Sequence, residues 1–198
     1  MVDMNDTDGK VAGTLLFVGC SQSIVGIMIA EARHPGYSIS GNAISDLGVG
    51  PAALIFNSSI ILLGLMILAS SYFIQRAFRR PKFTSLLVFT AIGTTGVGIF
   101  PENFGIIHLI VSLIAFLFGG LSAIAAYRLQ KPPLSYFSII AGFITLLALV
   151  LFITGQFLGL GFGGMERMIV YPVLLWAIGF GGYLIASSNA LGSPADRA

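Results

Sequence analysis

The sequence predicts an all-α integral membrane protein: a single domain over residues 1–198 that folds as a bundle of six transmembrane helices. Hydrophobic residues make up 56% of the chain and charged residues only 9%, and the mean hydropathy is +0.95. In soluble proteins about a quarter of the residues are charged. Six apolar runs also approach the length of about 20 residues that a helix needs to cross a hydrocarbon core of about 30 Å.

These six runs follow one another along nearly the whole chain, which leaves no room for a separate soluble domain. The N-terminal segment "MVDMNDTDGK" is acidic and lacks the basic region of a secretory signal, so the first run is expected to be a retained helix. The expected spans lie near residues 11–30, 52–73, 84–100, 106–127, 134–156 and 168–187.

The basic residues predict the orientation of the bundle. Eight of the ten lie in the termini and in the second and fourth connections, on one side of a six-span chain, whereas only Arg33 and Arg167 lie on the other side. Because cytoplasmic loops carry an excess of Lys and Arg, we expect a multi-pass protein of the cell membrane with both termini in the cytoplasm. The eight are Lys10, Arg76, Arg79, Arg80, Lys82, Arg128, Lys131 and Arg197.

Several classes of protein are excluded by the residues present. The single cysteine, Cys20, cannot form an intrachain disulfide or a multi-cysteine metal site. No phosphate-binding loop, dinucleotide-binding glycine pattern, haem attachment site or zincin motif is present. The net charge of +2 follows from the membrane topology, so no nucleic-acid partner is expected, and membrane lipids are the expected surroundings.

The first outer connection, "SISGNAISDLGVGP" at residues 38–51, is unusually polar for this chain, yet isoleucine and leucine recur in it. We therefore expect it to fold back on the bundle. Ser40 or Asn42 could cap a short helix there, and Gly48 could end it. Ser45 and Asp46 lie among apolar residues, where an ionised carboxylate needs a partner or water. Arg167 is a candidate partner of Asp46, so Asp46 could belong to a structural ion pair or act as a functional carboxylate.

The second outer connection, "FPENFGIIH" at residues 100–108, contains Glu102 and places His108 in or near the first turn of the fourth helix, which Asn103 could cap. The positive end of a helix dipole disfavours imidazolium, so a neutral histidine is expected. Such a histidine could act as a base, as a ligand or only as a hydrogen-bonding residue. With Ser112 it shares a face that should point into the bundle.

The third outer connection, "LGLGFGGMERM" at residues 158–168, is rich in glycine and contains the adjacent charges Glu166 and Arg167. Tyr171 shares a helical face with Arg167. Pro172 removes one backbone donor and predicts a kink. Freed carbonyl groups beside charged side chains could form a membrane site, or could simply reflect packing.

The stretches "GNAISDLGVGP", "FPENFGIIH" and "GGMER" resemble the prokaryotic six-span family designated domain of unknown function 998 (DUF998), over essentially the whole chain. The resemblance implies a multi-pass fold and no particular activity. The chain is also loosely similar to intramembrane hydrolases of the alkaline ceramidase type, which bind zinc with three histidines and have seven spans. This chain has two histidines and six spans, so the similarity assigns no zinc ligand here.

Three hypotheses for the function follow. The first is a protein whose outward-facing polar pocket binds a small polar ligand or a lipid headgroup, because ionisable groups within membranes mark functional sites. The second is an intramembrane lipid hydrolase, in which Asp46 or His108 is the general base and Ser45 or a metal-bound water is the nucleophile. The third is an accessory subunit whose outer polar groups only satisfy one another. The sequence assigns no catalytic residue, metal, cofactor or oligomeric state. The candidate ligand-binding residues are Ser45, Asp46, Glu102, His108, Glu166, Arg167 and Tyr171.

Overall fold

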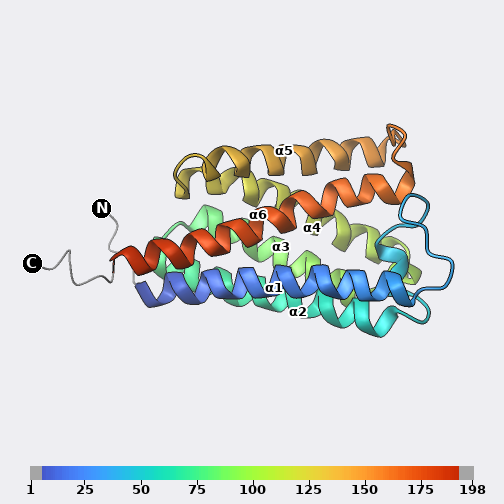
Figure 1. The fold of residues 1–198 in the computed structure, drawn as a ribbon, viewed down its shortest axis with the longest axis horizontal. Helices are drawn as coiled ribbons and strands as arrows, with labels where there is room; N and C mark the ends of the chain where they lie inside the picture. The colour runs from blue at the N-terminus through green and yellow to red at the C-terminus, as the bar shows by residue number, and fades with distance from the viewer. Residues whose placement is uncertain (1–5, 192–198) are drawn as a thin grey trace, which may run out of the picture.

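The computed structural model describes the backbone of residues 6–191 and the side chains of residues 7–188, and this part of the chain is built from helices without strands (Figure 1). The predicted all-α fold is confirmed. Three short 3-10 turns lie between the long helices: η1 (Ser45–Gly48), η2 (Glu102–Phe104) and η3 (Ala126–Leu129). The long helices are α1 (Asp6–Arg33), α2 (Ala53–Phe78), α3 (Pro81–Ile99), α4 (Ile106–Ala125), α5 (Leu134–Ile153) and α6 (Gly161–Leu191).

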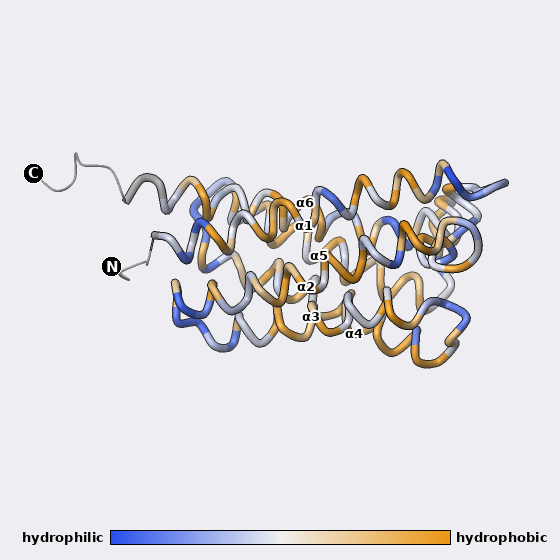
Figure 2. Tube along the Cα trace, turned by 90° about the horizontal axis from the view of Figure 1, so that it is seen from below, coloured by the Kyte–Doolittle hydropathy of each residue, from blue (hydrophilic) through white to orange (hydrophobic). Residues whose placement is uncertain are grey.

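All six long helices are long and apolar enough to cross a membrane. Figure 2 shows hydrophobic residues along the middle of the bundle and hydrophilic residues gathered at its two ends. The chain is therefore a multi-pass membrane protein. We call the end where α1 begins and α6 finishes the terminal end. The opposite end carries the α1–α2, α3–α4 and α5–α6 connections (Figure 1) and is called the capped end.

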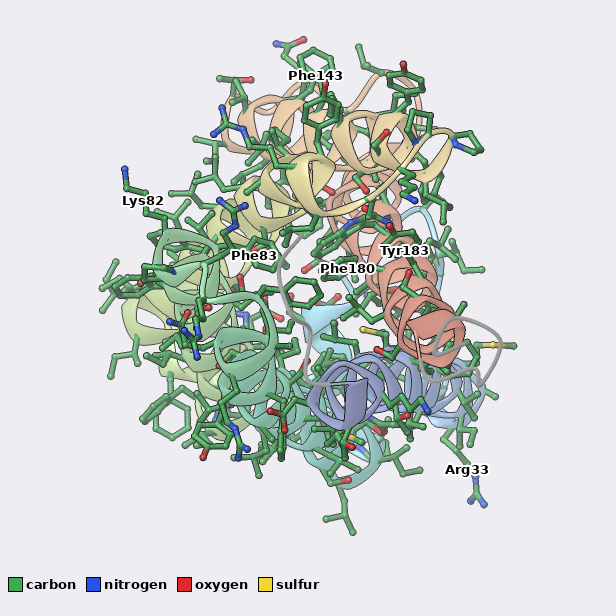
Figure 3. The ribbon with its side chains drawn as sticks, turned by 90° about the vertical axis from the view of Figure 1, so that its left-hand side faces the viewer. Arg33, Lys82, Phe83, Phe143, Phe180 and Tyr183 are labelled. Carbon is green, nitrogen blue, oxygen red and sulfur yellow. The ribbon has the colours of Figure 1, made fainter. Side chains whose placement is uncertain are left out.

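The helices form a ring. Each packs against its neighbour in the chain, α6 returns to pack against α1, and α6 also contacts α4. This last contact leaves α5 outside a smaller ring that consists of α1, α2, α3, α4 and α6. At the terminal end the ring is filled by Phe83 and Phe180, which point toward each other in Figure 3 and meet edge to face with 5.8 Å between ring centroids.

Close backbone contacts and buried hydrogen bonds hold the ring together. This is expected in a membrane, because lipid tails are as apolar as the helix side chains and the hydrophobic effect does not drive the helices together. Gly13 and Gly181 bring the backbones of α1 and α6 together, because a Cβ on either would overlap the carbonyl of the other. Ser70 Oγ of α2 donates to the carbonyl of Ala12 at 2.9 Å. Thr145 Oγ1 of α5 donates to the carbonyl of Ile169 at 3.0 Å, close to Pro172 within α6.

Several details at the capped end differ from the sequence-based expectations. Helix α6 begins at Gly161, seven residues before the expected start, so its charged pair lies inside the helix and not in a loop. The left-handed residue before α2 is Gly50, with φ of 80°, and not Gly48. Neither Ser40 nor Asn42 caps η1, whose N-cap is Ile44. Asn103 does not cap α4, because it lies within η2 and the N-cap residue of α4 is Gly105.

Candidate functional site

Residues 34–52, which we call the cap segment, lie across the capped end of the ring (Figure 1). Ile44, Leu47 and Ala52 are buried and pack with Ile27 of α1 and Phe56 of α2 in one apolar cluster. This agrees with the sequence-based expectation that the connection folds back on the bundle. Its apolar residues close the ring, and the polar residues between them therefore meet the ends of the helices.

Arg167 of α6 holds the cap segment in place. Its Nη1 donates to the carbonyls of Ile39 at 2.8 Å and Asn42 at 3.1 Å. Its Nη2 donates to Glu31 Oε1 at 2.5 Å and to the hydroxyl of Tyr37 at 2.7 Å. The side chain of Arg167 is 8% exposed and that of Glu31 is 18% exposed, so this is a largely buried ion pair. The candidate pairing of Arg167 with Asp46 is wrong, because Arg167 pairs with Glu31 instead.

Glu166 holds the same segment by accepting hydrogen bonds. The amide of Ile44 donates to its Oε2, and both the amide and the hydroxyl of Ser45 lie within hydrogen-bonding reach of its carboxylate. Glu166 is 5% exposed. Two adjacent residues of α6 thus satisfy the backbone of the cap segment in opposite ways. Arg167 donates hydrogen bonds to its carbonyl groups, and Glu166 accepts hydrogen bonds from its amide groups.

The glycines before this pair make the approach possible. The amide of Gly163 donates to the carbonyl of Ser40 at 3.0 Å. A Cβ at Gly163 would overlap the carbonyl of Asn42, and one at Gly161 would overlap that of Ser40. The sequence "GFGGMER" therefore contains everything that binds the cap segment: the glycines leave room for its backbone, Glu166 accepts hydrogen bonds from it, and Arg167 donates hydrogen bonds to it.

Asp46 and Glu102 lie on the other side of the cap segment, facing an open hollow. The side chain of Asn42 and the amide of Ala43 both donate to Asp46 Oδ2, at 2.9 and 3.1 Å. The carboxyl of Glu102, in η2, is close enough to Asp46 to share a hydrogen bond with it. The hollow has a volume of about 630 Å³ and is lined by His34, Asn42, Asp46, Val49, Gly50, Glu102 and Asn103.

The electrostatics of the hollow are acidic. Partial burial of the carboxyl, followed by the hydrogen bond and the charge repulsion from Asp46, raises the pKa of Glu102 to about 7. The lining contains no Lys or Arg among the described residues. Near pH 7 the pair is therefore partly protonated, and a positive charge in the hollow would favour loss of that proton.

Burial raises the pKa of Tyr37 to about 12, although the hydrogen bond from Arg167 opposes the shift. The Tyr37 hydroxyl accepts from Arg167 and donates to the carbonyl of Ala43 at 2.8 Å. The guanidinium also lies 5.5 Å from the centre of the Tyr37 ring. The phenol thus stays neutral and links the helix to the cap segment.

The other two candidate residues have more local surroundings. His108 is buried, as its helical face predicted, and its ring nitrogens meet the carbonyl of Phe100 at 2.8 Å and the hydroxyl of Ser112 at 3.2 Å. These contacts join the start of α4 to the end of α3, and His108 lines neither the hollow nor the ring interior. Tyr171 is half-buried, one turn beyond Arg167 and close to its guanidinium.

Behind the cap segment, the ring encloses an apolar cavity of about 100 Å³. Its walls come from η1 and from the five ring helices, and none of its lining residues belongs to α5 among the described residues. Ser45 and Glu166 lie at its capped end, and Trp176 and Ala177 lie farther down α6. We call this space the ring cavity.

Sequence reasoning missed Glu31, Tyr37 and Gly163 as parts of the site. The sequence position of Glu31 could have identified it, because Glu31 is the carboxylate that directly follows the first apolar run, at the outer end of that helix. Tyr37 and Gly163 had none, since their roles depend on contacts between segments more than 120 residues apart. The described residues contain no group of three or more His, Cys, Asp or Glu side chains placed to hold a metal ion.

The three stretches that were singled out in the sequence meet at one end of the bundle. Residues 12–183 match the family described as "Protein of unknown function (DUF998)", a match that reaches into all six helices and into the cap segment. No curated protein and no solved structure matches the chain. Because the family match covers most of its length, the chain belongs to the DUF998 family of membrane proteins.

Proposed function

We propose that this protein binds a small, positively charged polar group, an amine in particular, in the hollow beside Asp46 and Glu102. The observation that carries the proposal is the carboxyl pair itself. Two carboxyl groups lie close enough to share a hydrogen bond, the pKa of Glu102 is raised to about 7, and no Lys or Arg of the described chain lines the space they face. A cation replaces the proton that the pair would otherwise retain.

Arg167 is one of two basic residues at the capped end, and its charge is already paired outside the hollow. Arg167 is buried against Glu31 and the carbonyls of the cap segment, so it does not neutralise the hollow. Asn42 and Asn103 add amide groups to the lining, and these can bond a ligand hydroxyl or carbonyl. The volume of about 630 Å³ lies within the range of about 300 to 1,000 Å³ that is usual for small-ligand sites.

The hollow faces the outside of the cell in this proposal, with the termini in the cytoplasm of a cell-membrane protein. Seven basic side chains belong to the terminal-end connections or to the first turns of α1, whereas Arg33 and Arg167 belong to the capped end. The buried ion pair of Arg167 strengthens this bias, because only Arg33 remains as an exposed positive charge at the capped end among the described residues. Arg197, counted in the sequence, lies outside the described residues.

Cysteine labelling tests the orientation. Cys20 is buried and is the only cysteine, so the background in intact cells is low. Gln156→Cys, at an exposed site in the α5–α6 connection, should react with a membrane-impermeant maleimide in intact cells. Lys131→Cys, exposed at the terminal end, should react only after lysis. The reverse pattern would place the hollow in the cytoplasm.

Ligand binding is tested by the thermal unfolding of purified protein, followed through the exposure of Cys20 to a thiol-reactive dye. Ethanolamine should raise the unfolding midpoint at pH 8 more than at pH 5.5, because Glu102 loses its proton between these values. Glu102→Gln should abolish the effect, whereas Asp8→Asn, which removes a carboxyl at the terminal end of the bundle, should leave it. Glycerol, an uncharged polar solute, serves as the control ligand.

A lipid headgroup and a free solute share this chemistry, so the source needs a second comparison. Bilayers that contain phosphatidylethanolamine should stabilise the protein more than phosphatidylglycerol bilayers if the amine belongs to a lipid. If only soluble ethanolamine acts, the ligand is a solute. Absence of stabilisation by either amine would refute the proposal and favour an accessory role, in which the outer polar groups serve the fold alone.

One contact favours the hydrolase hypothesis as a second candidate. The hydroxyl of Ser45 lies within hydrogen-bonding reach of the Glu166 carboxylate, at the entrance to an apolar cavity, where a carboxylate could serve as general base for a serine. Labelling by a fluorophosphonate probe, lost in Ser45→Ala, would support this candidate. His108 does not contribute to such a pair, since its nitrogens face Phe100 and Ser112.

A further inference from the structure

A basic surface lies at the terminal end of the bundle, where the two-residue connection between α2 and α3 reverses the chain. Arg79, Arg80 and Lys82 are exposed there, and we call these three residues the basic turn. Figure 3, which looks at this end, shows Lys82 directed away from the bundle, whereas Phe83 points into the ring. The two helices that flank the basic turn contain no acidic residue.

The positive charges of the basic turn have no partner in the described part of the chain. The nearby Arg76 pairs with Asp8 at 3.1 Å, but no ion pair joins a side chain of the basic turn to any described residue. Lys82 also lies in the first turn of α3, where the positive end of the helix dipole disfavours a cation. Arg80, the N-cap residue, forms no side-chain hydrogen bond to that helix. The local electrostatics therefore favour an anion from outside the chain.

An apolar stripe continues from Lys82 along the outer face of α3. Phe89 and Ile92 are exposed on this face, at helical spacings of seven and three residues. Phe89 also stacks on Phe118 of α4, with 4.7 Å between ring centroids, so two helices form the wall. Ten residues separate Lys82 from Ile92, which corresponds to about 15 Å along the helix. This is half of a hydrocarbon core of about 30 Å, the depth of one leaflet.

From this combination we propose that the basic turn and the stripe beside it bind one phospholipid with a net negative headgroup, such as phosphatidylglycerol. Arg80 and Lys82 bind the phosphate, since basic residues next to a membrane span attract anionic lipids. An acyl chain lies along Phe89 and Ile92. A phospholipid has these two parts in the same order, a charged head at the membrane surface and a chain as long as one leaflet is deep. The amine site lies at the opposite end of the bundle, so either proposal can fail without the other.

Native mass spectrometry tests the headgroup contact, because it resolves the lipids that stay bound to purified protein as a lipid is titrated into the detergent solution. The wild type should bind a first phosphatidylglycerol molecule more tightly than it binds phosphatidylcholine, which has no net charge. Arg80→Gln/Lys82→Gln should weaken phosphatidylglycerol binding about 25-fold, because each basic side chain near an anionic lipid contributes about fivefold. The same double variant should bind phosphatidylcholine as the wild type does.

A second double variant is matched in charge. Arg128→Gln/Lys131→Gln removes two exposed basic side chains from the same end of the bundle, at the connection between α4 and α5. It should weaken phosphatidylglycerol binding by no more than about fivefold, the effect of a single basic residue. Equal losses in the two double variants would indicate diffuse attraction to the whole terminal end and would overturn the proposal. Lys82→Gln alone, with an expected loss of about fivefold, replaces the first double variant if that variant folds poorly.

Two comparisons test whether the ligand is a lipid. Phe89→Ala shortens the apolar stripe and should weaken phosphatidylglycerol binding severalfold, whereas Phe143→Ala, at an exposed position of α5, should not. Glycerol 3-phosphate, a phosphate headgroup without acyl chains, should not displace the lipid at equal concentration.

Displacement by glycerol 3-phosphate would identify a soluble anion as the ligand and overturn the proposal. Equal binding of phosphatidylglycerol and phosphatidylcholine to the wild type would overturn it as well, and so would equal effects of the two phenylalanine substitutions. Phosphatidylglycerol is also the reference lipid for the amine site, so that comparison is made in the Arg80→Gln/Lys82→Gln variant.

Discussion

The ion pair between Arg167 and Glu31 gives the sharpest prediction about stability. Replacing Arg167 by Met removes the donor to five acceptor groups on α1, the cap segment and α6 itself. It also leaves a carboxylate that is 18% exposed without its partner. Removing one member of a buried pair costs about 3 to 5 kcal/mol, because the remaining charge stays desolvated. Arg167→Met should therefore lower the free energy of unfolding by about this amount.

A double-mutant cycle separates the pair from the packing around it. Glu31→Gln should cost less than Arg167→Met, since a glutamine oxygen still accepts a hydrogen bond. The double variant should lose less than the sum of the two single losses, by about 1 to 3 kcal/mol, because it leaves no unpaired charge. If the loss in the double variant equalled the sum of the two single losses, the two side chains would not interact.

The assay uses the protein's own cysteine. Cys20 is 1% exposed, so a thiol-reactive dye reacts with it only as the bundle opens, and the transition with denaturant gives the free energy of unfolding. Arg33→Gln is the control, since Arg33 is exposed at the same end of the bundle and its loss should change stability by no more than about 0.5 kcal/mol. If Arg167→Met resembled this control, the clamp between α6 and the cap segment would not exist in solution.

Three further predictions concern single positions. The pKa of the Glu102 carboxyl is about 7 in the folded protein and 4.5 ordinarily, so the folded state retains a proton that the unfolded state loses between these two values. The free energy of unfolding should therefore fall as the pH rises from about 4.5 to about 7. Glu102→Gln should remove this pH dependence from unfolding curves measured through Cys20. Tyr37→Phe leaves the carbonyl of Ala43 without its donor and should cost about 1 to 3 kcal/mol, against almost nothing for the exposed Tyr136→Phe. Gly163→Val should release the cap segment and make it sensitive to protease, whereas Gly179→Val, with nothing within 4 Å, should not.

The fold could be predicted because its causes are local. A hydrocarbon environment requires runs of apolar residues and internal backbone hydrogen bonds, so composition and run length indicate the six helices directly. The gathering of the charged residues at the two ends of the bundle follows from the same physics. The start of α6 was misjudged, because the glycines at 161, 163 and 164 read as a loop when helix propensity alone is considered. In the structure these glycines belong to the helix, and Gly161 and Gly163 allow the cap segment to approach it.

The partners of the charged residues could not be predicted. Arg167 was a candidate partner for Asp46 because both were expected at the outer surface, yet it pairs with Glu31, 136 residues away. Asp46 instead pairs with its own segment through Asn42 and Ala43, and meets Glu102 across the hollow. Such choices depend on how closely two backbones approach, which no residue spacing encodes. The ring cavity arises in the same way, from the packing of five helices.

The most direct test of the whole account is amide hydrogen exchange of the cap segment, measured by mass spectrometry on protein in lipid nanodiscs. Residues 38–48 are fixed to α6, because the amide of Ile44 donates to Glu166 and the carbonyls of Ile39 and Asn42 accept from Arg167. Peptides that cover Ile44 and Ser45 should therefore exchange as slowly as the ends of the helices, and Glu166→Leu should make them exchange within seconds. Rapid exchange in the wild type, equal to that of a free loop, would contradict it.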